Sequence, residues 1–179
     1  MGAVRRVYFY LVSGVSLGVL LVGLASLGSV VLEMLLGGGG APEGQRLAIA
    51  SSVAEVLVAV PIWVLHWQWA QRAARRDPTE QGSALRRLYL YGVAAVLSLT
   101  AIAQLNPALA ELLGLLERSD APFRLLEFGR ALWQSALPAV FWAYHFRLVS
   151  LDRAAIGEAE ASATLRRWYA YGLQVVAFL

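Results

Sequence analysis

Long runs of apolar residues constrain this chain more than any other feature of its sequence. Val7–Leu32 is a 26-residue run without a charged side chain, and Leu47–Ala70 is a run of 24 that contains Glu55 and His66. Leu88–Ala110 adds 23 uncharged residues. Crossing the hydrocarbon core of a bilayer takes about 20 mostly apolar helical residues. Each of these three runs is therefore long enough to form a transmembrane helix.

Two further apolar runs are shorter. Arg130 and Arg147 bracket only 16 residues, so a fourth span has to extend over roughly Phe128–Ser150, with both arginines reaching back toward the lipid head groups. The fifth run has 12 residues, from Trp168 to Leu179, too few to cross a bilayer. We expect an all-α integral membrane bundle with four full transmembrane helices and the start of a fifth. We also expect the natural protein to continue beyond this point.

Composition supports a membrane protein over a soluble one. Apolar residues make up 59% of the chain and charged residues 15%, where a soluble domain carries about 25% charged residues. The net charge of +3 would suggest a nucleic-acid partner in a soluble protein. Here the fifteen basic residues are all arginine and gather beside the apolar runs, so we expect no nucleic-acid partner. The chain has no cysteine, which excludes disulfides and thiolate chemistry.

The distribution of arginine predicts the orientation. Eleven arginines lie on the side of the N-terminus, namely Arg5, Arg6, Arg72, Arg75, Arg76, Arg86, Arg87, Arg147, Arg153, Arg166 and Arg167. Four lie on the other side, namely Arg46, Arg118, Arg124 and Arg130. Short cytoplasmic segments carry the excess of positive charge. We therefore expect a cytoplasmic (inner) membrane protein with a cytoplasmic N-terminus and outward loops near 33–46 and 111–127.

A six-residue motif occurs three times at a nearly constant spacing. Its copies are Arg5-Arg6-Val7-Tyr8-Phe9-Tyr10, Arg86-Arg87-Leu88-Tyr89-Leu90-Tyr91 and Arg166-Arg167-Trp168-Tyr169-Ala170-Tyr171, at offsets of 81 and 80 residues. A second motif, Trp63-x-x-His66-Trp67, matches Trp142-x-x-His145-Phe146 at an offset of 79. Fixed-period similarity indicates a repeat architecture. We predict tandem two-helix repeats over 1–84 and 85–164 and the start of a third over 165–179, all inserted in the same sense.

The arginine and tyrosine motif has a simple physical interpretation. Paired arginines at a cytoplasmic helix start meet lipid phosphates, and tyrosines favour the membrane interface. The side chains assigned to this role are Arg5, Arg6, Tyr8, Tyr10, Arg86, Arg87, Tyr89, Tyr91, Arg166, Arg167, Tyr169 and Tyr171. Membrane lipids, anionic ones in particular, are then the expected partners. A specific ligand site is the alternative for the same residues.

These motifs resemble those of a known family. An RRxYxY element that opens one hydrophobic helix, followed by the Pro61-to-Trp67 element that ends the next, is similar to a bacterial multi-pass membrane family of unknown function. It is the 5671 series of such domains, from Chloroflexota and similar bacteria. The resemblance implies repeated helix pairs and longer chains but no activity or active site. The second repeat departs from it, because Pro138 lies nearer the start of its helix.

Two histidines and one glutamate are the candidates for chemistry. His66 and His145 occupy equivalent positions, and paired histidines from separate helices can hold haem b. Surrounding aromatic residues favour the alternative, in which each imidazole bonds to backbone, tyrosine or interfacial water. Glu55 is the one carboxylate well inside an apolar run. It is a candidate for proton relay, or it is protonated or paired with Arg130.

Two further patterns predict packing. Gly14 and Gly18 form a small-residue ridge on which helices can approach closely, with the partner left open between another span, another copy and a different subunit. The segment from Asn106-Pro107 to Arg118 carries an amphipathic leucine pattern. We expect it to form a short interfacial helix at the outer surface.

Three functional classes follow from these features. The one we favour is a non-catalytic membrane subunit or scaffold with no cofactor, no metal and no enzyme activity, bound to other subunits or to itself. The second is a haem b electron-transfer subunit that uses His66 and His145. The third is a transporter or channel component, which depends on Glu55.

Overall fold

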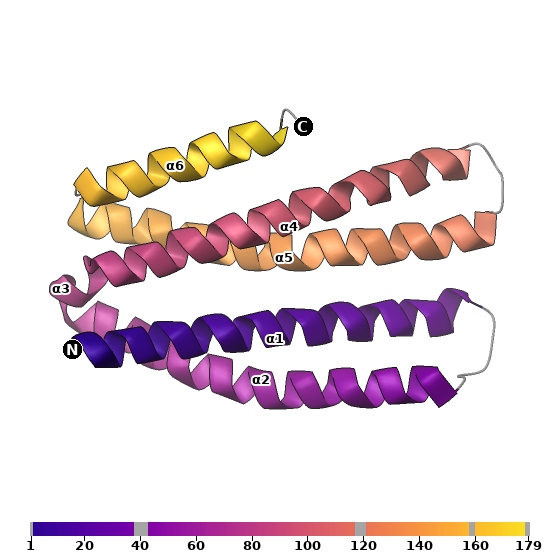
Figure 1. The fold of residues 1–179 in the computed structure, drawn as a ribbon, viewed down its shortest axis with the longest axis horizontal. Helices are drawn as coiled ribbons and strands as arrows, with labels where there is room; N and C mark the ends of the chain where they lie inside the picture. Colours follow the sequence, from indigo (N-terminus) through magenta and orange to yellow (C-terminus); the bar gives the residue numbers. More distant parts are fainter. Residues whose placement is uncertain (1, 38–42, 117–120, 158–159, 178–179) are drawn as a thin grey trace.

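The chain is helical throughout its described part. The structure is a computed structural model and describes residues 2–37, 43–116, 121–157 and 160–177. Its helices are α1 (Ala3–Leu36), α2 (Glu43–Arg76), α3 (Pro78–Gln81), α4 (Ala84–Leu116), α5 (Ala121–Ile156) and α6 (Glu160–Ala177). Helices α1 and α2 form one antiparallel pair and α4 and α5 a second, with α6 alongside α4 (Figure 1). The all-α prediction is confirmed.

Local residue chemistry explains where several helices begin and end. Gly37 closes α1 by donating its N–H to Glu33 O at 2.7 Å. Asp77 caps the short α3 because its carboxylate accepts the Thr79 N–H at 2.9 Å, and Pro78 fills the first helical position, where no N–H is needed. Gly157 ends α5 with φ of 73°, a left-handed conformation that glycine adopts without steric cost.

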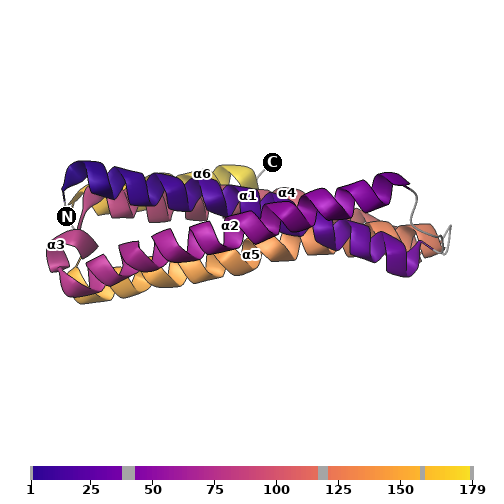
Figure 2. The same cartoon turned by 90° about the horizontal axis from the view of Figure 1, so that it is seen from below.

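The first helix of each pair runs in the same direction. Helices α1, α4 and α6 all begin at the end of the bundle that holds the N-terminus, whereas α2 and α5 return to it (Figure 1). At this N-terminal end α1, α4 and α6 lie in one layer and α2 and α5 in the other (Figure 2). Helices α1 and α4 end, and α2 and α5 begin, at the opposite end of the bundle, called the far end (Figure 1).

Three helices are long and apolar enough to cross a membrane, namely α1, α2 and α4. Helix α1 has 34 residues and would be about 50 Å long at 1.5 Å per residue, against a hydrocarbon core of about 30 Å. Helix α5 has 36 residues, but polar side chains such as Gln134 and His145 interrupt its apolar part. Helix α5 is therefore not one of the helices in the described part of the chain that meet this condition.

The segment after Asn106 differs from the predicted short surface helix. Helix α4 continues through Pro107 to Leu116 without a break, so that prediction was wrong. A proline inside a helix loses one backbone hydrogen bond, yet long apolar helices tolerate it when neighbours satisfy the freed groups. Ala108 and Gly114 after the proline are buried, so packing against the bundle extends the helix.

Close helix contacts occur at glycines other than the predicted pair. Trp133 of α5 lies against Gly28 and donates its indole N–H to Leu24 O at 3.0 Å. Gly23 faces Glu55 on α2, where a Cβ would lie 3.0 Å from the glutamate Cβ. Gly18, by contrast, has no atom within 4 Å of that position among the described residues. Of the predicted pair, Gly14 makes an ordinary contact with Tyr89 of α4, whose Cε2 would lie 3.5 Å from a Cβ at that position. The tighter approaches on α1 are those at Gly23 and Gly28.

Candidate functional site

The N-terminal end of the bundle holds a surface ion pair that crosses between elements. Arg6 of α1 donates from Nε and Nη2 to the two carboxylate oxygens of Glu80 in α3, at 2.7 and 2.6 Å. The Glu80 side chain is 3% exposed. The hydrogen bonds from the Arg6 guanidinium lower the pKa of Glu80 to about 2. This bidentate geometry ties the connecting helix to the start of α1.

A second ion pair lies deeper, between the two helices of the second pair. Arg86 is 1% exposed. Its Nε donates to Asp152 Oδ2 at 2.7 Å, and its Nη2 donates to Gln71 Oε1 at 2.9 Å. Gln81 completes the group by donating to Asp152 Oδ1 at 3.0 Å. Arg86 therefore has partners inside the protein and no surface for a lipid head group, contrary to the role predicted from its place in the motif.

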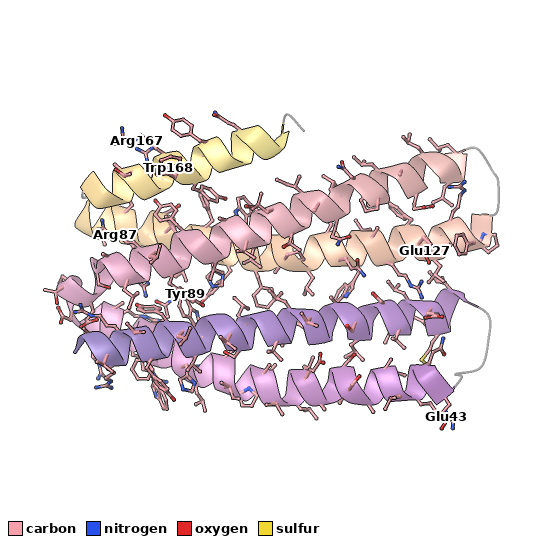
Figure 3. All side chains as sticks on the ribbon, viewed as in Figure 1. Glu43, Arg87, Tyr89, Glu127, Arg167 and Trp168 are labelled. Carbon is pink, nitrogen blue, oxygen red and sulfur yellow. The ribbon has the colours of Figure 1, made fainter. Side chains whose placement is uncertain are left out.

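The remaining residues of the motif divide between surface and interior. The side chains of Arg5, Tyr8, Arg166, Arg167 and Tyr171 are exposed, those of Tyr10 and Tyr91 are buried, and those of Arg87, Tyr89 and Tyr169 are half-buried. Tyr89 projects from α4 into the space between the two helix pairs (Figure 3). The exposed members keep the geometry that lipid contact requires. The buried tyrosines act instead as packing surfaces between pairs.

The aromatic rings around Tyr89 join the two pairs. Its ring centroid lies 5.2 Å from that of Tyr10 on α1 and 5.3 Å from that of Trp67 on α2. Trp67 donates its indole N–H to the Tyr144 hydroxyl of α5 at 2.7 Å. Aromatic pairs at such distances stabilise by about 0.5–1.5 kcal/mol each beyond area burial. The motif tyrosine is therefore an inter-pair contact.

The two histidines occupy separate aromatic surroundings. His66 has Nδ1 at 2.8 Å from Ile62 O and Nε2 at 3.2 Å from the Tyr8 hydroxyl. His145 is fully buried, with Nδ1 at 2.8 Å from Phe141 O. The predicted bonding of each imidazole to backbone, with tyrosine added at His66, is confirmed.

The haem alternative meets obstacles in this arrangement. The His145 ring packs against Trp67 at 5.5 Å and Tyr89 at 6.1 Å. His66 has its own ring contact with Trp69, at 5.4 Å. Ligation of one iron by both imidazoles would require these rings to move aside and Tyr8 to release the His66 Nε2. The described residues thus do not form a porphyrin site as they stand.

Glu55 and Arg130 do not pair. Arg130 of α5 is held instead by Glu33 of α1 and Glu127 of its own helix, both at 2.7 Å. Glu55 lies over Gly23 with its Oε2 3.3 Å from where a Cβ would be, at partial exposure. The suggested Glu55–Arg130 pair was therefore wrong, and the role of Glu55 stays a prediction.

The Arg130 network is a polar group that the apolar-run analysis missed. Together with Arg124, whose Nη1 lies 3.4 Å from Glu111 Oε2, it clusters charge near the far end of the bundle. Glu127 marks this region in Figure 3, opposite the end where Arg87 and Arg167 lie. No group of three or more His, Asp or Glu side chains in the described ranges is arranged to hold a metal ion.

Comparison with known families settles the family. The profile of the family described as Domain of unknown function (DUF5671) matches residues 6–136. The chain belongs to the DUF5671 family. The match starts in the first arginine motif and ends inside α5. No curated protein and no solved structure matches this DUF5671 chain.

Proposed function

We propose that this DUF5671 protein is a non-catalytic integral membrane subunit or scaffold, built from tandem helix pairs that insert in the same sense. In this proposal α5 is the fourth span, with α6 the beginning of a third pair. The N-terminal end of the bundle faces the cytoplasm of a bacterial cell, since eleven of the fifteen arginines belong to that side. The membrane is then the bacterial inner membrane.

One observation carries the membrane assignment, namely the apolar exterior of the bundle. Only 22%, 11% and 33% of the most apolar parts of α1, α2 and α4 are buried inside the protein. Large apolar side chains more than half exposed include Val15, Val22, Leu57, Val58 and Val96. Exposed apolar surface of this extent requires a membrane or a partner to cover it.

Recurring contacts support the tandem arrangement. Tyr10 meets Tyr89 at 5.2 Å and Tyr91 meets Tyr169 at 6.2 Å. Likewise Trp67 meets Tyr89, and Phe146 meets Tyr169 at 6.4 Å. The residues of each second contact follow those of the first by 79 to 81 positions. One interface, used twice, would join the first pair to the second and the second to α6.

The state of the internal charged groups supports a structural role over a catalytic one. Arg86 is bound by Asp152 and Gln71, and Arg130 by two glutamates. Groups engaged in this way hold helices together and present no free nucleophile or base. A scaffold needs defined helix pairs and an outer surface for partners, both of which this arrangement supplies.

Extraction from membranes tests the proposal first. The full chain should remain in the membrane fraction after alkaline carbonate washing and should purify only with detergent. The same purified sample should show no Soret absorbance, which separates the scaffold from the haem alternative. Release by carbonate would contradict the membrane assignment. A Soret band lost in His66→Ala or His145→Ala would make electron transfer the leading function.

A further inference from the structure

Two adjoining hollows lie between the helix pairs in the far half of the bundle. The first, the polar recess, has a volume of about 430 Å³ and is lined by Ser29, Gln104, Glu111, Glu127, Arg130 and Gln134. The second, the apolar trough, has a volume of about 340 Å³ and is lined by Gly18, Val22, Val96, Leu97 and Leu137. Gln104 and Gln134 line both hollows, so the two adjoin each other.

The trough lies where helices α1 and α4 move apart from each other. Helices α1 and α4 diverge toward the far end, and α5 passes between them (Figure 1). The trough takes residues from all three, including Val22, Val96 and Leu137. Gly18 faces it without any atom within 4 Å of a Cβ position, which keeps the trough open. Each hollow alone is within the range of roughly 300–1,000 Å³ typical of small-molecule sites.

The charge of the recess favours a cation. Glu33, Glu111 and Glu127 face Arg124 and Arg130 in this region, which leaves one negative charge in excess among these five groups. Both of the Arg130 contacts are short, at 2.7 Å, so its charge is already neutralised. A primary ammonium group with three N–H donors complements such a set of carboxylates.

From these observations we propose that the recess and trough together bind one phospholipid whose head group carries a primary ammonium, of the phosphoethanolamine class. The ammonium lies against the carboxylates of the recess and an acyl chain fills the trough. The Gln104 amide, at the junction of the hollows, faces the ester or phosphate oxygens. This inference rests on the proposed membrane placement, because only there does the trough open onto hydrocarbon. The proposed lipid site is distinct from the contact with anionic lipids that is expected of the exposed arginines at the N-terminal end.

Lipid retention by the purified protein tests the inference. The full chain is reconstituted in vesicles of equal phosphatidylethanolamine and phosphatidylglycerol with identical acyl chains, extracted in mild detergent, and its bound lipids are counted by native mass spectrometry. We expect one retained lipid, with the ethanolamine species favoured about tenfold, near the lower end of what one hydrogen bond to a charged group contributes. Equal retention or a preference for phosphatidylglycerol would overturn the head-group assignment.

Two matched pairs of variants localise the binding. Gly18→Leu fills the trough and should abolish retention, whereas Gly92→Leu, at a glycine equally free of neighbours in a groove nearer the N-terminal end, should retain lipid as the natural chain does. Glu111→Gln should lower the preference for ethanolamine to about parity, and Glu43→Gln, an exposed site outside the recess, should leave it unchanged. Any reversal of these four outcomes overturns the proposed site.

The same preparations distinguish failure of this inference from failure of the proposed function. A chain that resists carbonate extraction but retains no lipid contradicts the lipid site alone. A chain released by carbonate contradicts the membrane assignment on which the site depends.

Discussion

Arg86 shows how a residue can leave the role that its sequence motif suggests. It opens the second copy of the arginine and tyrosine motif, yet it lies inside the bundle with Asp152 and Gln71 as partners. An arginine at a helix start is typical of lipid contact, and the sequence near Arg86 shows no other partner. The carboxylate that binds it, that of Asp152, lies in another helix 66 residues later. The histidines were easier to predict, since their Ile62 and Phe141 carbonyl partners lie four residues earlier in the same helix.

Removing one partner of this buried pair should destabilise the protein strongly. Arg86→Met leaves the Asp152 carboxylate without its guanidinium and should lower the free energy of unfolding by about 3 kcal/mol or more. Unfolding by SDS titration in mixed micelles measures this change. The double variant Arg86→Met/Asp152→Leu should recover much of the loss, because no unpaired charge remains. Arg167→Met, at an exposed arginine, is the control and should be near neutral.

The Arg6–Glu80 pair predicts a dependence of stability on pH. The folded-state pKa of Glu80 is about 2, below its ordinary value of 4.5. A lowered carboxylate pKa stabilises the folded state fully above the ordinary value. That contribution should disappear as the pH falls from about 5 to 2. Thermal melting at several pH values should therefore show a steeper acid loss in the natural chain than in Glu80→Gln. Parallel pH curves for the two proteins would contradict the pair.

At the scale of the element, the apolar runs predicted the helices well but not the tightest contacts between them. All three long uncharged or nearly uncharged runs lie inside single helices, because length and composition are local properties. The face that α1 presents to its neighbours depends on which large side chain approaches it, here Trp133. Continuation of α4 past Pro107 likewise depends on tertiary contacts of Ala108 and Gly114, which no local rule contains.

The glycines of α1 provide a paired test of this packing. Gly28→Ala would place its Cβ against the Trp133 indole and break the hydrogen bond to Leu24 O, so we expect a loss of about 1–3 kcal/mol from overpacking. Gly18→Ala meets no atom within 4 Å and should be neutral or stabilising by up to about 1 kcal/mol through helix propensity. Melting temperatures in detergent compare the two. Equal effects would contradict the α1–α5 contact.

At the scale of the whole molecule, orientation is the prediction that remains to be tested. The chain has no cysteine, so single cysteines report position without background. Gly44→Cys in α2 lies near the far end and Ala154→Cys in α5 near the N-terminal end, both exposed. In intact cells an impermeant maleimide should label the first and not the second, because we propose that the arginine-rich end faces the cytoplasm. The opposite pattern would reverse the orientation.

The position of the link between α2 and α4 has a consequence for synthesis. Helix α1 begins, and helix α2 ends, at the N-terminal end of the bundle (Figure 1), so the whole first pair precedes Arg86 in the chain. Chains fold from the N-terminus during translation. The Tyr10 and Trp67 rings that Tyr89 contacts in the folded protein are therefore synthesised before it. Each finished pair can therefore serve as the template on which the next pair assembles.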